Sequence, residues 1–220
     1  MAQLPDSPEL TPTRYRELSS YDPEKLFELL RATVVATVAW VRDGQPMVLP
    51  TAFGFDDDAI YLHGSTGSHF GRDMADGRPL SVSITSLDGF VYARTGYDSA
   101  VHYRSAVIRG SASMCEGEEK FRALEIITEH LLPGRWAELP APTGKELAAT
   151  LVLRIPLDQV SLKILDGGVE EDADDPQDWA MWAGVVPVRL VATEPITSAH
   201  TESGVTAAPS TTEQLRRFRL

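Results

Sequence analysis

The segment His102-Tyr103-Arg104-Ser105-Ala106-Val107-Ile108-Arg109-Gly110-Ser111-Ala112 decides the fold that we expect for this chain. From Ala106 onward, the alternation of side chains indicates a β-strand, whose successive residues point to opposite faces of a sheet. Tyr103, Arg104 and Ser105 then place a ring, a guanidinium and a hydroxyl at one rim of that sheet. These groups suit a flat ligand that carries phosphate, because a guanidinium binds two oxygens and a ring packs on a flat face. Taken alone, the segment also fits a barrel strand that carries a surface arginine.

The composition of the chain limits its partners. The chain has 220 residues, 43% of them hydrophobic, which is enough for one β-barrel domain with a core. Its 20 basic and 32 acidic residues give a net charge of −12, and so acidic a surface repels nucleic acid and anionic membranes. We therefore expect no nucleic-acid partner and no membrane partner.

The single cysteine and the first residues of the sequence predict a cytoplasmic protein. Cys115 has no second cysteine with which to form a disulfide, so a reducing compartment is expected. No nearby histidine activates this thiol, and we expect it to be a buried structural residue. Residues 1–20 contain no apolar segment of a signal peptide, and no apolar run in the sequence is long enough to span a membrane.

Turn and cap signals divide the chain into three parts. We expect an extended arm over residues 1–21, a barrel domain over residues 22–194 and a polar tail with little capacity to pack over residues 195–220. The barrel domain begins with Asp22-Pro23-Glu24, which supplies an N-cap, a proline and an acidic first turn for a helix.

The expected strands are short and are joined by hairpin turns at Asp43-Gly44 and Leu87-Asp88-Gly89. We expect strands at 33–41, 47–55, 59–63, 80–85, 89–94, from 103 onward, 151–155, 160–164 and 182–192, and a solvated loop at 170–178. We expect further helices at 68–75, at 118–132 and after a capping box at 143–146. This pattern predicts a mainly β fold, a β-barrel with peripheral helices.

Two more segments carry groups that suit a ligand. In His63-Gly64-Ser65-Thr66-Gly67-Ser68-His69, the glycines allow close backbone approach, and a helix that begins at Ser68 would offer free amides to an anion. The histidines of the chain show no metal-binding spacing, so we expect no metal site of protein ligands. In Trp179-Ala180-Met181-Trp182, the tryptophans fit either core packing or an aromatic wall beside a flat ring.

Taken together, seven motifs resemble the pyridoxamine 5′-phosphate oxidase-like flavoproteins, in the branch related to nitroimidazole-resistance reductases. The motifs occur in the same order as in that family. They are His63-Gly64-Ser65, Asp88-Gly89-Phe90-Val91, Tyr103-Arg104-Ser105 with Gly110, Leu132-Pro133-Gly134-Arg135-Trp136, Glu146-Leu147-Ala148-Ala149-Thr150, Ser161-x-Lys163 and Trp182-Ala183-Gly184-Val185-Val186-Pro187. The resemblance covers residues 12–195.

The resemblance implies an FMN-binding split barrel of antiparallel, Greek-key type. It also implies a homodimer with two FMN sites at the subunit interface. The residues implied to bind the cofactor are Met47, Val48, Leu49, Pro50, His63, Gly64, Ser68, His69, Arg104, Ser105 and Trp182. By this resemblance, Met47 to Pro50 lie along the isoalloxazine ring, His63 and Gly64 flank it, and Ser68 and His69 meet the phosphate. No catalytic side chain is implied, because the flavin carries the redox chemistry.

The chain departs from the family pattern at two places. Relatives commonly carry arginine or lysine where this chain has His69, so permanent positive charge near the phosphate is reduced. After Lys163, relatives often carry an arginine and then Gly-Pro-Pro, whereas this chain reads Ile164-Leu165-Asp166-Gly167-Gly168. Both departures affect cofactor identity and leave the fold unchanged.

The leading hypothesis is an FMN-dependent oxidoreductase or flavin reductase that acts on a small molecule. The alternatives are a non-catalytic flavin carrier and a split barrel that binds a deazaflavin or haem. Haem would need an axial ligand, for which the candidates are His63, His69 and His102. Oxidation of pyridoxamine phosphate itself is disfavoured, because the sequence offers no extra basic residues for a second phosphate.

Overall fold

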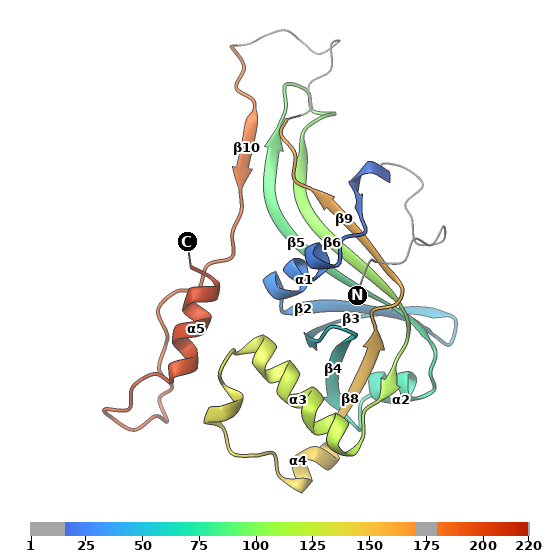
Figure 1. The fold of residues 1–220 in the computed structure, drawn as a ribbon, viewed down its shortest axis with the longest axis vertical. Coiled ribbons are helices and arrows are strands. Elements are labelled where there is room, and N and C mark those ends of the chain that lie inside the picture. Colours follow the sequence, from blue (N-terminus) through green and yellow to red (C-terminus); the bar gives the residue numbers. More distant parts are fainter. Residues whose placement is uncertain (1–15, 170–179, 220) are drawn as a thin grey trace.

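The computed structural model describes residues 16–169 and 180–219, whose strands form one antiparallel sheet (Figure 1). The strands are β1 (Ser19–Ser20), β2 (Val35–Arg42), β3 (Gln45–Phe55), β4 (Ala59–Ser65), β5 (Pro79–Tyr92), β6 (Ala100–Ser111), β7 (Ser113–Met114), β8 (Thr150–Pro156), β9 (Val160–Leu165) and β10 (Gly184–Pro187). The helices are η1 (Arg16–Leu18), α1 (Pro23–Ala32), α2 (His69–Ala75), α3 (Gly117–Leu131), η2 (Trp136–Glu138), α4 (Gly144–Ala149) and α5 (Pro209–Arg217). The mainly β fold with peripheral helices is confirmed.

The order of the strands is β1-β9-β6-β5-β2-β3-β4-β8-β7, and β10 adds to β5. Every pairing is antiparallel. The sheet curls into a half-barrel, and β5 and β6 extend beyond it as a long ribbon with β10 alongside (Figure 1).

The hairpin expected at Leu87-Asp88-Gly89 is wrong. Instead of turning, β5 continues through this segment as one strand, with a register shift against β6 between Leu87 and Gly89. A β-bulge takes up the irregular residues without reversing the chain, so the turn signal marks a kink in a long strand.

The main core fills the concave side of the sheet, and α1 and α2 close it. Asp22 caps α1 by accepting a hydrogen bond from the Glu24 amide at 3.0 Å, as the sequence predicted. Four buried side chains of α1 enter the core: Leu26, Phe27, Leu29 and Leu30. In α2, Phe70 packs against Trp40 with ring centroids 5.3 Å apart, and the Trp40 indole donates to Asp73 at 2.9 Å.

Helix α3 covers a second, smaller core on the convex side of β3, β4 and β8. This core contains Ala59, Tyr61, Cys115, Ala123, Ile127 and Val152. A Cβ atom at Gly54 would lie 2.6 Å from Ile127 Cα, so the helix backbone lies directly on β3. Cys115 is buried as expected, and burial raises the pKa of its thiol to about 11.

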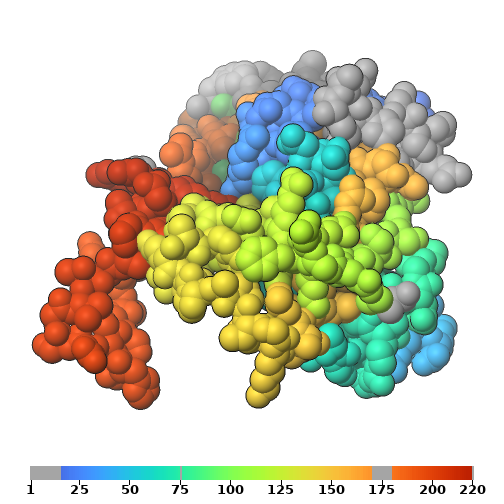
Figure 2. Space-filling model, turned by 60° about the horizontal axis from the view of Figure 1, so that its bottom comes forward, coloured from blue at the N-terminus to red at the C-terminus, as the bar shows by residue number. Residues whose placement is uncertain are grey.

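The segment after residue 187 contains a helix where the sequence predicted a polar tail. Glu138 accepts hydrogen bonds from the Ser210 amide at 2.8 Å and from its hydroxyl at 2.7 Å, which satisfies donors in the first turn of α5. Arg217 donates to the carbonyl oxygens of His130 and Arg31, at the ends of α3 and α1. In Figure 2 this segment, orange to red, projects from the body of the molecule beside α3 and η2. The expected loop at 170–178 lies outside the described residues.

Candidate cofactor site

The convex side of the sheet that α3 leaves uncovered is the candidate site, and we call it the open face. Alternation along the strands places on it Val35, Thr37, Ala39 and Val41 of β2, Val48 and Pro50 of β3, Ser81, Ser83, Thr85 and Leu87 of β5, Tyr103, Ser105, Val107 and Arg109 of β6, and Ser161, Lys163 and Leu165 of β9. Large apolar side chains stand exposed on this face, among them Val41 at 61% and Val48 at 62%. Exposed valines gathered on one surface are typical of a surface that binds a ligand or another protein chain.

The four residues predicted on β3 divide between the two sides of the sheet. Met47 and Leu49 pack against the main core, whereas Val48 and Pro50 are exposed on the open face. This division follows from strand geometry, because successive side chains of a strand point to opposite faces of the sheet. Only Val48 and Pro50 therefore present side chains to a ligand on the open face.

His63 lies at the border of the open face. It points to the same side of β4 as Tyr61, which lies opposite Gly54 on β3. The His63 side chain is exposed and makes no hydrogen bond with the described residues. Gly64 follows it at a point where an added Cβ would meet no atom closer than 3.9 Å.

The helix start predicted at Ser68 is present, and the Ser68 hydroxyl serves as its cap. The Ser68 hydroxyl caps α2 by accepting from the Gly71 amide at 3.0 Å. His69 Nδ1 lies 3.2 Å from Arg72 Nη2. A guanidinium only donates, so Nδ1 is the acceptor in this contact. Arg72 thus supplies, one turn later, the permanent positive charge that His69 lacks.

Arg104 and Ser105, predicted to act together, point to opposite faces of β6. Ser105 lies on the open face, in register with Lys163 on β9, whose ammonium is 5.5 Å from the centre of the Tyr103 ring. Arg104 lies on the concave side and holds Asp88 through two bonds, Nε to Oδ2 at 2.8 Å and Nη2 to Oδ1 at 2.9 Å. Burial raises the pKa of Asp88, but the hydrogen bonds from Arg104 and Ser86 outweigh it and hold that pKa below its usual range.

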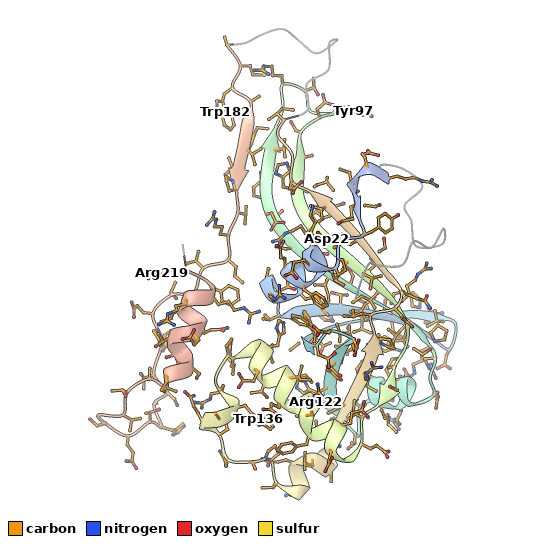
Figure 3. The ribbon with its side chains drawn as sticks, in the orientation of Figure 1. Asp22, Tyr97, Arg122, Trp136, Trp182 and Arg219 are labelled. Atoms are coloured by element: carbon orange, nitrogen blue, oxygen red, sulfur yellow. The ribbon has the colours of Figure 1, made fainter. Side chains whose placement is uncertain are left out.

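Trp182 is far from the other predicted residues. It lies beside β10 near the outer end of the β5–β6 ribbon, whose tip carries Tyr97 (Figure 3). Its indole packs against the Tyr92 ring with centroids 5.6 Å apart, and 63% of the residue is exposed. Within one protomer Trp182 does not reach β3 or β4, so the chain alone does not assemble the complete predicted set.

Sequence reasoning missed three groups that the structure brings forward. Asp88 and Lys163 stood within the quoted motifs but were given no role, and Arg72 was not considered. The spacing from His69 to Arg72 within a helix was the signal for their contact, because residues three apart share a face. No sequence signal pairs Arg104 with Asp88, because their contact depends on the register of two strands.

An antiparallel half-barrel with an open, partly apolar face defines the split-barrel class of flavin-binding proteins. The chain belongs to the pyridoxamine 5′-phosphate oxidase family, whose sequence model matches residues 22–164. No curated protein sequence matches the chain.

Two solved structures resemble the chain over nearly its whole length. The FAD and heme binding protein from Mycobacterium smegmatis is 40% identical, with 90% of this chain and 97% of that chain covered and a TM-score of 0.86. The flavocytochrome Anf3 from Azotobacter vinelandii is 29% identical, with 97% and 98% covered and a TM-score of 0.87. A structure described as a candidate 5-nitroimidazole antibiotic resistance protein from Bacteroides thetaiotaomicron is 20% identical, covers 66% of this chain and 86% of that chain, and shares the fold with a TM-score of 0.56.

Proposed function

We propose that this chain is a homodimeric flavoprotein oxidoreductase that binds both a flavin and haem. The observation that carries the proposal is the extent of the similarity to the Mycobacterium smegmatis protein, named for FAD and heme, over 90% of this chain. The family model ends at residue 164, so this similarity includes a large part of the carboxy-terminal region beyond it. FAD is therefore our proposed flavin in place of FMN.

The open face suits a flavin at a dimer interface. Small hydroxyl side chains such as Ser83 and Thr37 leave room for a flat ring and offer hydrogen bonds, and Val48 and Val107 offer apolar contact. A bound flavin would supply the redox chemistry, and the chain would orient the ring and exclude water from it. A second copy of the chain would cover the remaining valines and bring its own Trp182 to the site.

If haem binds, His63 would be the side chain that holds its iron. Its imidazole is exposed at the border of the open face and is free of hydrogen bonds to the described residues. His69 is less suited because its Nδ1 is held by Arg72. His102 lies on the same side of β6 as Arg104, away from the open face. A neutral histidine nitrogen is the usual protein ligand for haem iron in globins and peroxidases.

The absorption spectrum of the purified protein tests the cofactors. We expect flavin bands together with the intense absorption band of haem, and release of FAD when the protein is denatured. His63→Ala should lose most of the haem band and keep the flavin, whereas the control His200→Ala, an exposed histidine in the carboxy-terminal segment, should keep both. A protein that keeps the haem band in His63→Ala, or that takes up no haemin, contradicts the haem proposal.

Turnover separates an enzyme from a carrier. A reduced nicotinamide mixed with the holoprotein should bleach the flavin bands within the time of mixing, and a small electron acceptor should restore them. A flavin that stays oxidised with every donor would identify a carrier.

The compartment that we propose is the cytoplasm, in line with the single Cys115. Among the described residues, no helix has the length and apolar character needed to cross a membrane.

A further inference from the structure

One edge of β5 is divided between two strands that do not meet. β2 pairs with β5 over Leu80–Ser83, and β10 pairs with it over Gly89–Tyr92. Val188 extends the second contact by donating to the Asp88 carbonyl at 2.9 Å. Between them, Ile84–Leu87 has no strand partner on this edge among the described residues.

A pocket of about 650 Å³ lies at this break in the pairing. The loop between α1 and β2 lines one side, and the segments around β10 and after α5 line the other. The lining residues are Arg31, Ala32, Thr33, Val34, Val35, Thr85, Ser86, Leu87, Asp88, Arg104, Val188, Arg189, Leu190, Arg217, Phe218 and Arg219. The pocket therefore depends on residues 188–190 and 217–219, which lie beyond the matched family region.

The charges that line this pocket are strongly unbalanced. Five arginines face one acid, Asp88, and that carboxylate is already held by Arg104. Arg31 pairs with Glu24 at 2.6 Å. Arg189 and Arg219 are exposed and form no ion pair with the described residues. Three lining arginines, Arg189, Arg217 and Arg219, thus have no carboxylate partner among the described residues, which is unusual in a chain with a net charge of −12.

Arg217 adds a half-buried positive charge without a carboxylate partner among the described residues. Its guanidinium donates to two backbone carbonyls and lies 5.1 Å from the centre of the Phe218 ring. Burial lowers the pKa of this guanidinium, so its charge is poorly compensated. An anion in the pocket would lower the cost of burying that charge.

The remaining walls of the pocket are apolar, with Val34, Val35, Leu87, Leu190 and Phe218 among them. We propose that the pocket binds a small organic anion, with an apolar or aromatic body and a phosphate or carboxylate group held by Arg189 and Arg219. Arginine suits such oxyanions because its planar fork binds two oxygens at once. Three lining residues, Val35, Thr85 and Leu87, belong to the edge of the open face, whereas Arg189 and Arg219 lie outside it. We propose this anion site as additional to the flavin and haem of the proposed function, and it does not depend on them.

Titration calorimetry of the purified protein with 1-naphthyl phosphate tests the proposal. We expect saturable binding that is about tenfold or more tighter than that of inorganic phosphate, and no saturable binding of uncharged 1-naphthol. 1-Naphthoate, run in parallel, distinguishes carboxylate from phosphate recognition. Flavin absorbance is followed in the same samples. Displacement of flavin would show that the anion occupies the cofactor site, and would overturn the proposal of a separate site.

Matched arginine variants locate the binding. Arg189→Ala and Arg219→Ala should each weaken 1-naphthyl phosphate binding about tenfold, since a hydrogen bond to a charged group contributes that much. The control is Arg216→Ala, because Arg216 is an exposed neighbour that pairs with Glu213 at 2.6 Å and does not line the pocket. Its affinity should stay within about twofold of the parent value. Equal affinities in all three variants, at unchanged melting temperatures, would overturn the proposal.

Discussion

Arg104 and Asp88 meet across β6 and β5, with Nε 2.8 Å from Oδ2 and Nη2 2.9 Å from Oδ1. Both side chains are about a quarter exposed, at 26% and 28%, so water weakens this pair only in part. The two bonds to Asp88 use the Arg104 guanidinium, which the sequence analysis predicted to bind a cofactor phosphate. Binding of flavin by Arg104 stays a prediction, which flavin titration of Arg104→Ala measures.

Arg104→Ala should lower the free energy of unfolding by about 1–2 kcal/mol, because Asp88 loses both of its charged donors. Asp88→Asn should lose a similar amount. Urea denaturation of the two single variants and the double variant gives the coupling energy of the pair. The double variant should lose less free energy of unfolding than the sum of the two single-variant losses. Flavin titration of the same proteins shows whether affinity changes with Arg104. Additive losses would contradict the pairing.

The Asp88 carboxylate also makes the pair pH-dependent. Because its folded-state pKa lies below the usual value of about 3.9, the stabilisation is present above that value and is lost as pH falls through the folded pKa. Comparison of unfolding free energies at pH 6 and pH 3 should therefore show a smaller loss in Asp88→Asn than in the parent protein. An identical loss in both would contradict this prediction.

His130 should destabilise the fold as the solution becomes acidic. Burial, assisted by the Arg217 charge and opposed by the hydrogen bond to the Thr33 carbonyl, lowers the pKa of His130 to about 4. The unfolded chain takes up this proton near pH 6.5, so stability is complete above that value and falls as pH decreases toward 4.

Between pH 7.5 and pH 5, the loss due to His130 should be about 2 kcal/mol. His130→Phe keeps an aromatic ring beside Phe53 and Phe55 and removes the titrating group. The unfolding free energy of the parent should therefore fall by about 2 kcal/mol relative to that of His130→Phe as pH decreases from 7.5 to 5. A constant difference across the range would show that His130 titrates alike in both states.

A charge on the open face should break the proposed dimer. Val48→Glu places a carboxylate where 62% of the residue is exposed in the protomer and where a second copy would bury it. The control is Val205→Glu, because Val205 is similarly exposed at 59% and lies in the carboxy-terminal segment. Sedimentation should show a monomer for Val48→Glu and a dimer for the control and the parent. A parent protein that sediments as a monomer at micromolar concentration would contradict the shared interface.

Gly54→Ala should destabilise the protein by about 1–3 kcal/mol, the usual range for overpacking a tight contact. Its Cβ would lie 2.6 Å from Ile127 Cα and 2.8 Å from Ile127 N, and a backbone moves less readily than a side chain. Gly64→Ala is the matched control on the next strand, because its Cβ would meet nothing closer than 3.9 Å. Thermal melts compare the two variants, and equal melting temperatures would contradict the close packing of α3.

Local signals in the sequence predicted most elements correctly. Asp43 and Gly44 have φ angles of 51° and 73°, as a tight hairpin turn requires. The capping box at Thr143 and Glu146 is present, and helix α4 follows it. Such features depend on a few neighbouring residues, and for that reason they can be read before the fold is known.

Features that depend on distant residues could not be predicted in the same way. The turn signal at Leu87–Gly89 is overruled because β6 pairs with β5 on both sides of it. Nothing local shows that Arg104 faces Asp88 while Ser105 faces Lys163. Likewise, α5 has no side-chain cap of its own at Ala208, and its donors are satisfied by Glu138, 72 residues earlier.

The two carbonyls bound by Arg217 have a consequence for the order of folding. The contacts join Arg217 to His130 and to Arg31, which are 87 and 186 residues away in the sequence. Contacts of such long separation form late, because the intervening chain must first be closed into a loop. The last turns of α1 and α3 should therefore gain their full protection from hydrogen exchange only when residues 188–219 dock. The same turns should be among the first parts of the protein to open when that segment detaches.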